Sequence, residues 1–153
     1  MEKKNNHKDC ECAICKHGVE AVRKMQEESV KKYGWYVHVV QDPRCPANTN
    51  VHTHHLVESF GHKDLQICLN INPKTSHRLL ADAISEIKNG VKFEPGKKYG
   101  KIINNYQVEF IEAIEEGRSV LRMLIPDENG KYEGIYAEQL TKLNNADLNI
   151  NMN

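Results

Sequence analysis

The sequence predicts an α+β domain, in which an antiparallel sheet of about five strands carries two to three packing helices. Short alternations of apolar and polar residues, typical of strands, recur between turn-forming residues. Two longer stretches have the apolar spacing of amphipathic helices. The connections between successive strand candidates are short, which favours antiparallel neighbours over parallel ones.

Length and charge indicate one domain without a strongly charged partner. The 153 residues include 21 Lys and Arg and 21 Asp and Glu, so the formal net charge is zero, which argues against a general nucleic-acid binder. We expect a flexible cysteine-rich segment over residues 1–18, a single domain over 19–143 and a disordered tail over 144–153. No apolar run approaches the ~18 residues of a membrane span. Because the N-terminal residues also lack the apolar region of a secretory signal, we expect a cytoplasmic protein without a membrane partner.

The first half of the chain predicts one helix and three strands, namely helix Val19–Lys32 and strands Trp35–Val40, Val51–Val57 and Leu65–Asn70. In the helix, apolar residues repeat at helical spacing, and Gly34 follows its end. Residues 41–50 contain two prolines with Asn and Thr, so we expect a loop there. Residues 59–64 contain Gly61 and polar neighbours, which indicates a turn.

The second half predicts a well-delimited helix from Asn72 to Asn89, strands Tyr106–Ile114 and Ser119–Ile125, and a last helix over Ile135–Leu143. Asn72 suits the N-cap of the first helix and Pro73 its first turn, while Gly90 suits its C-terminal end. Residues 91–101 contain the turn-forming pair Pro95 and Gly96, which predicts a connector without regular structure.

Five segments and a short cysteine-containing start form a recognisable pattern, namely Tyr33–Val37, Thr53–Leu56, Phe60–Leu65, Gly90–Gly96 and Pro126–Gly130. In these segments the chain resembles a bacterial family known as domain of unknown function 4262. The resemblance implies a single domain of bacterial cytosolic origin and carries no activity to transfer. Before Leu56 the family usually has an aromatic residue, Thr, an aliphatic residue and Gly. This chain keeps Thr53 and has His52, His54 and His55 at the other three positions.

Four of the eight histidines lie between Val51 and His62, and this segment is the main candidate for a metal site. Side chains two residues apart on a strand point to the same face, so His52 and His54 could bind one ion. Imidazole ligands favour zinc or another divalent transition metal. We expect His62 as the third ligand, and the other candidates are His38, His77 and Glu58. The alternative is a cluster of histidines that lie on the surface or only form hydrogen bonds.

Two carboxylates near these histidines are candidates for acid–base catalysis, namely Glu58 and Asp64. A metal ion with an open coordination position lowers the pKa of bound water, so the site could serve a small metal-dependent hydrolase. Each carboxylate could instead orient an imidazole or belong to the charged surface.

A second candidate metal site lies at the N-terminus, where Cys10, Cys12, Cys15 and His17 fall within eight residues. The pair Cys12 and Cys15 has the spacing of half a structural zinc site. Plain reduced thiols are the alternative, and a disulfide framework is not expected without an export signal.

Two functions therefore stay open. The first is a metal-binding protein, in the sharper form a hydrolase, that uses the histidine strand. The second is a non-catalytic module that binds a small molecule or a protein, with the cysteine cluster as a structural zinc site.

Overall fold

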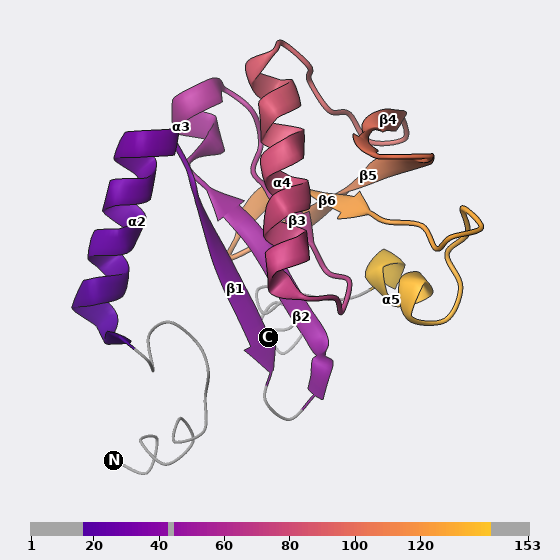
Figure 1. Ribbon diagram of the computed structural model, residues 1–153, viewed down its shortest axis with the longest axis horizontal. Coiled ribbons are helices and arrows are strands. Elements are labelled where there is room, and N and C mark those ends of the chain that lie inside the picture. Colours follow the sequence, from indigo (N-terminus) through magenta and orange to yellow (C-terminus); the bar gives the residue numbers. More distant parts are fainter. Residues whose placement is uncertain (1–16, 43–44, 142–153) are drawn as a thin grey trace.

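The computed structural model describes residues 17–42 and 45–141. The predicted N-terminal cysteine segment, apart from its last two residues, and the predicted tail lie outside them. The described residues form a six-stranded mixed sheet in the order β1-β2-β3-β6-β5-β4, with four helices (Figure 1). The strands are β1 (Tyr36–Asp42), β2 (Cys45–His54), β3 (Leu65–Ile67), β4 (Lys98–Ile103), β5 (Tyr106–Glu115) and β6 (Arg118–Leu124). The helices are α2 (Val19–Tyr33), α3 (Leu56–Phe60), α4 (Pro73–Lys88) and α5 (Ile135–Thr141).

The α+β class is confirmed, whereas the purely antiparallel sheet of about five strands is corrected to a mixed sheet of six. Strands β3 and β6 pair in parallel, with Leu65 opposite Leu121, and every other neighbouring pair is antiparallel. The chain leaves β3, passes through α4 and the β4–β5 hairpin, and only then returns as β6. Such a long connection allows the parallel pairing that short connections exclude.

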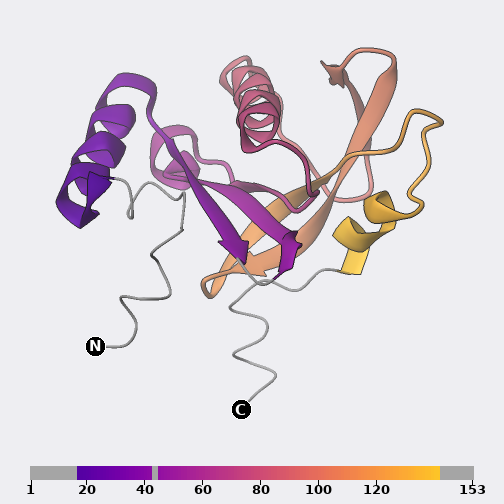
Figure 2. The same cartoon turned by 60° about the horizontal axis from the view of Figure 1, so that its bottom comes forward.

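Helix α4 is confirmed with the predicted ends. Asn72 caps it, because its side-chain oxygen accepts a hydrogen bond from the Lys74 amide at 2.9 Å, and Pro73 occupies the first turn. Figures 1 and 2 show α4 lying across one face of the sheet. Its buried stripe packs into the main core with β2, β3, β5 and β6. The shared core residues include Leu80, Ile84, Val51, Ile67, Phe110 and Met123.

Two predicted boundaries in the β1–β2 region are wrong. Strand β2 begins at Cys45, where a loop was expected. Strand β3 pairs only with Val51 and His52, so among the described residues the first half of β2 has β1 on one side and an open side on the other. A proline is tolerated beside such an open side. The strand also ends at His54 instead of Val57, because His55 adopts a left-handed conformation with φ 82° and is the N-cap residue of α3.

One further incorrect expectation lies in the second half. Residues 98–103, expected in an irregular connector, form β4 and pair with β5. Their polar composition and Gly100 hide the alternation that would mark a strand. Strands β5 and β6 and helix α5 form where predicted. No helix in the described part of the chain is long and apolar enough to cross a membrane.

Candidate metal centre

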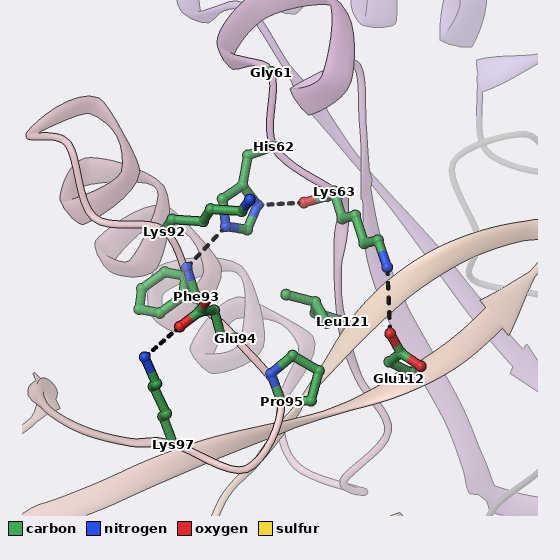
Figure 3. Close-up of a pocket in the computed structure, with 10 residues that line it drawn as sticks. All are labelled: Gly61, His62, Lys63, Lys92, Phe93, Glu94, Pro95, Lys97, Glu112 and Leu121. Atoms are coloured by element: carbon green, nitrogen blue, oxygen red, sulfur yellow. Dashed lines mark hydrogen bonds and ion pairs between the residues drawn. The ribbon is translucent and has the colours of Figure 1, made fainter.

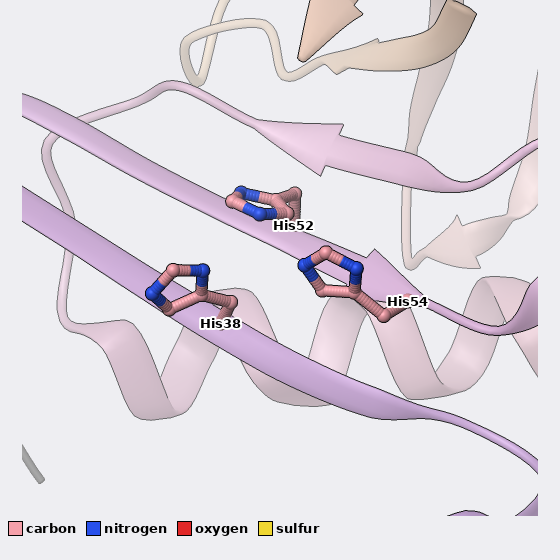
Figure 4. Close-up of side chains that lie close together, drawn as sticks. All are labelled: His38, His52 and His54. Carbon is pink, nitrogen blue, oxygen red and sulfur yellow. The ribbon is translucent and has the colours of Figure 1, made fainter. Parts of the chain in front are cut away.

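Three histidines meet on the face of the sheet opposite α4. His38 on β1 lies directly across from His52 on β2, and His54 follows two residues later on the same strand. One ring nitrogen from each of the three lies within 4.8 Å of the others. Figure 4 shows the three rings gathered beside the two strands. Ring centroids are 5.1 Å apart for His38 and His52 and 4.9 Å for His52 and His54.

The three histidines and the main core lie on opposite faces of the sheet, and the strand register explains why. Leu65 lies beside Leu121, and both belong to the α4 core. Their neighbours in sequence, Gln66 and Arg122, must therefore point to the other face. His52 pairs with Gln66 across β2 and β3, which places its ring on that second face.

The His52 ring is fully buried, and its Nδ1 atom has a defined environment. Nδ1 lies 3.2 Å from the Asn50 side-chain oxygen and 3.4 Å from Oε1 of Glu115. The Asn50 amide nitrogen donates to Glu115 at 2.9 Å, which identifies the Asn50 oxygen as the acceptor facing His52. Nδ1 must then carry the proton. The remaining nitrogen, Nε2, has a lone pair and is buried without a hydrogen-bond partner among the described residues.

This ring is held by a larger buried polar network. Gln66 donates to both the Asn50 oxygen, at 3.2 Å, and Glu115, at 3.3 Å, and it accepts from Arg122 Nε at 2.7 Å. Arg122 also donates to the backbone carbonyl of Gln139 in α5 at 3.1 Å. Since every member has partners, the network fixes the orientation of the imidazole.

Burial keeps the central imidazoles neutral at physiological pH. Burial, followed by the neighbouring His54 and His38, lowers the pKa of His52 to about 3. Burial and then Arg118 lower the pKa of His54 to about 4. Burial also raises the pKa of the Glu115 carboxyl, against hydrogen bonding from Asn50. Neutral imidazole is the form that binds transition metals.

One side of the group faces solvent. His38 and His54 are half-buried, whereas His52 is fully buried. The half-buried Tyr36 stacks on His54 with ring centroids 4.8 Å apart. An ion could therefore approach from the β1 side of the sheet and reach the buried nitrogen of His52.

The third predicted ligand, His62, lies elsewhere in the structure. Its Nδ1 donates to the Lys63 carbonyl at 2.7 Å, and its Nε2 accepts from the Phe93 amide at 3.1 Å. The structure brings His38, one of the other candidates, to His52 and His54 instead. His77, a further candidate, is exposed and lies against Trp35 at a centroid distance of 5.5 Å.

The two carboxylates proposed for catalysis have other contacts. Glu58 is exposed and lies 3.4 Å from the ring of His55. Asp64 is buried and accepts from the Thr53 hydroxyl at 2.8 Å and the Leu56 amide at 3.2 Å. It also pairs with Arg118. Neither belongs to the groups that could hold a metal among the described residues.

The carboxylate that does contact the candidate metal centre is Glu115, which sequence reasoning missed. It stands at the end of β5, one residue beyond the predicted strand, beside a turn in which a charged residue is ordinarily solvated. With Glu116 it forms a second group around His52 whose ligand atoms lie within 4.8 Å. Only the sheet order, which places β6 and then β5 beyond β3, brings it there.

The second predicted metal site remains a prediction. Cys10, Cys12 and Cys15 lie outside the described residues, and His17 is exposed just before α2.

Comparison with known proteins identifies the family. The model of the domain of unknown function DUF4262 matches residues 29–123, so the chain belongs to this family. The matched region covers β1 to β5 and all but the last residue of β6, and it includes all three clustered histidines and Glu115. No curated protein and no solved structure matches the chain.

Proposed function

We propose that this DUF4262 member binds a divalent transition-metal ion, with zinc as the expected ion, through His38, His52 and His54. The observation that carries the proposal is the buried Nε2 of His52, which has no hydrogen-bond partner in the described part of the chain. A buried polar atom without a partner costs about 1–3 kcal/mol, so such atoms are rare unless they have a function. Coordination of an ion satisfies this nitrogen.

The surroundings of His52 support the same proposal. Histidines that bind metals usually donate their second ring nitrogen to a carboxylate or carbonyl, which fixes the tautomer. His52 does this through Asn50 and Glu115. A tetrahedral zinc ion with bonds of ~2.0–2.1 Å needs ligand nitrogens roughly 3.3 Å apart. One ring nitrogen from each of the three histidines lies within 4.8 Å of the others.

Zinc content measured on purified variants tests the proposal. Wild-type protein should bind zinc at this site, and the double variant His52→Ala/His54→Ala should lose the zinc bound there. Elemental analysis and competition with a chelating dye measure the zinc content. Glu115→Gln should still bind zinc at this site, but with about 10–100-fold weaker affinity, because the carboxylate orients His52 without binding the ion.

His55→Ala is the matched control, since His55 follows His54 directly and contacts Glu58 instead of the cluster. The His55→Ala variant should bind zinc with the stoichiometry and the affinity of the wild type. If zinc content is unchanged in His52→Ala/His54→Ala and is lost in Cys12→Ala/Cys15→Ala, the alternative is correct, namely a binding module with a structural zinc site at its N-terminus.

A hydrolase is the second candidate function, and the number and exposure of the ligands favour it. Three protein nitrogens would leave a fourth position on a bound zinc ion, and His38 and His54 are half-buried rather than fully enclosed. Zinc held by these residues would lower the pKa of a bound water and so supply a nucleophile at neutral pH. Zinc-loaded protein should then hydrolyse p-nitrophenyl acetate, and His52→Ala/His54→Ala should not. Equal rates in the two proteins would eliminate this function.

A further inference from the structure

A pocket of about 920 Å³ opens on the other side of the sheet, independent of the three histidines. It lies between the turn after α3 and the connector that leads to β4, and Leu121 of β6 lines its base (Figure 3). Leu121 points to the α4 face, whereas Arg122, the next residue, points to the histidine face. The sheet therefore separates this pocket from the candidate metal centre.

His62 holds the two walls of the pocket together. It donates from Nδ1 to the carbonyl of Lys63 on one wall and accepts at Nε2 from the amide of Phe93 on the other. The ring is neutral in this arrangement, because Nε2 accepts a hydrogen bond. The side chain is buried, at 6% exposure, so the bond between the walls is protected from solvent. The pocket is thus largely preformed, as small-molecule sites usually are.

The connector that forms the second wall is also fixed. The Phe93 ring stacks on Phe110 of β5 at a centroid distance of 4.6 Å. The Glu94 amide donates to the Tyr99 hydroxyl at 2.9 Å, and the Gly96 amide donates to the Phe110 carbonyl at 3.3 Å. These contacts hold Pro95 and the neighbouring side chains in place around an apolar base.

The charges around the pocket leave one positive charge in excess. Its lining includes three lysines and two glutamates. Lys63 lies 3.6 Å from Glu112, and Lys97 pairs with Glu94. Lys97, through its hydrogen bond and charge, and to a smaller extent Lys92 lower the pKa of the Glu94 carboxyl. Lys92 forms no ion pair within the described part of the chain, so its ammonium group is available to a ligand.

We propose that this pocket binds a small organic monoanion, a carboxylate on an apolar body, with Lys92 as the principal charge partner. A volume of about 920 Å³ lies within the range of small-molecule sites. Leu121, Pro95 and Phe93 supply apolar contact for the body of the ligand. Lys92, the one lining lysine without an ion pair among the described residues, matches one negative charge. The exposed Lys63–Glu112 pair is weak enough to rearrange around the ligand.

Titration with benzoate, followed by ¹H–¹⁵N NMR spectra, tests this proposal. Benzoate should shift the backbone amide signals of Lys63, Phe93 and Glu94, in wild-type protein and in His52→Ala/His54→Ala alike. The second protein excludes coordination of benzoate to a metal ion. Lys92→Gln should weaken benzoate binding about fivefold, as expected for one exposed charge contact. Lys74→Gln removes an exposed lysine of α4 outside the pocket and should bind benzoate as the wild type does.

Benzamide, which has the same ring without the charge, and inorganic phosphate, which has charge without an apolar body, complete the test. Both should bind at least about fivefold more weakly than benzoate. Equal binding of benzamide or phosphate, unchanged affinity in Lys92→Gln, or loss of the shifts in His52→Ala/His54→Ala would each overturn the proposal. The NMR spectrum of each variant reports directly whether it is folded.

Discussion

Replacing Asp64 with alanine should lower the free energy of unfolding by about 3 kcal/mol and leave zinc content unchanged. The Asp64 carboxylate joins three parts of the chain. It accepts from the Thr53 hydroxyl in β2, from the Leu56 amide at the start of α3, and from Arg118 of β6. The Thr53 oxygen in turn accepts from the Leu65 amide at 3.0 Å. Removal of the carboxylate leaves buried donors without partners, and each costs about 1–3 kcal/mol.

The partial exposure of Arg118 limits this cost, because water can solvate its guanidinium group when Asp64 is absent. Urea denaturation of Asp64→Ala and wild-type protein measures the difference. Glu112→Ala is the matched control, since it removes an exposed carboxylate from a lysine pair and should cost less than about 1 kcal/mol. A loss of zinc from folded Asp64→Ala, or a stability equal to that of Glu112→Ala, would contradict the structural role of Asp64.

Metal-free protein should lose stability on acidification from about pH 6.5 to about pH 4. The pKa values of His52 and His54 fall from 6.5 to about 3 and about 4 in the folded protein. Between those values the unfolded chain binds more protons than the folded one, so protonation favours unfolding. The stabilising effect is complete above pH 6.5 and is lost as the pH approaches the folded pKa values. Each group contributes at most about 1.4 kcal/mol per pH unit.

Two features reduce the net loss of stability on acidification. His54 is half-buried, so solvent screens part of its interaction. The raised pKa of Glu115 acts in the opposite direction, because the folded protein holds that proton more firmly than the unfolded chain does. We therefore expect a loss on the order of 2–3 kcal/mol between pH 7 and pH 5.

Urea denaturation at a series of pH values measures this dependence. His54→Gln should reduce its slope, because one of the two titrating groups is removed. The exposed His77 offers the matched control, and His77→Gln should keep the wild-type slope, because His77 does not belong to the group of His38, His52 and His54. Constant stability between pH 7 and pH 5 would show that the folded protein accommodates charged imidazoles at His52 and His54.

The candidate site was only partly predictable from the sequence. Strand alternation placed His52 and His54 on one face, and the structure confirms this placement. The choice of His62 as their companion relied on proximity along the chain. Distance in space is set by strand pairing instead, and the β1–β2 hairpin brings His38 directly opposite His52. Both ring nitrogens of His62 are engaged at the pocket on the other side of the sheet.

By itself, the sequence determined the features that depend on neighbouring residues. The capped helix α4, the alternation in β1, β5 and β6 and the α+β class all follow from local periodicity and from preferences for caps and turns. Only the tertiary structure decided the features that depend on distant residues. Strand β4 forms because β5 offers it hydrogen bonds, and β3 pairs in parallel with a strand more than fifty residues away. Glu115 becomes a partner of His52 because β3 and β6 lie between β2 and β5 in the sheet. The local sequence pattern does not predict these long-range pairings. Burial and hydrogen bonding between strands depend on the packing of the whole chain.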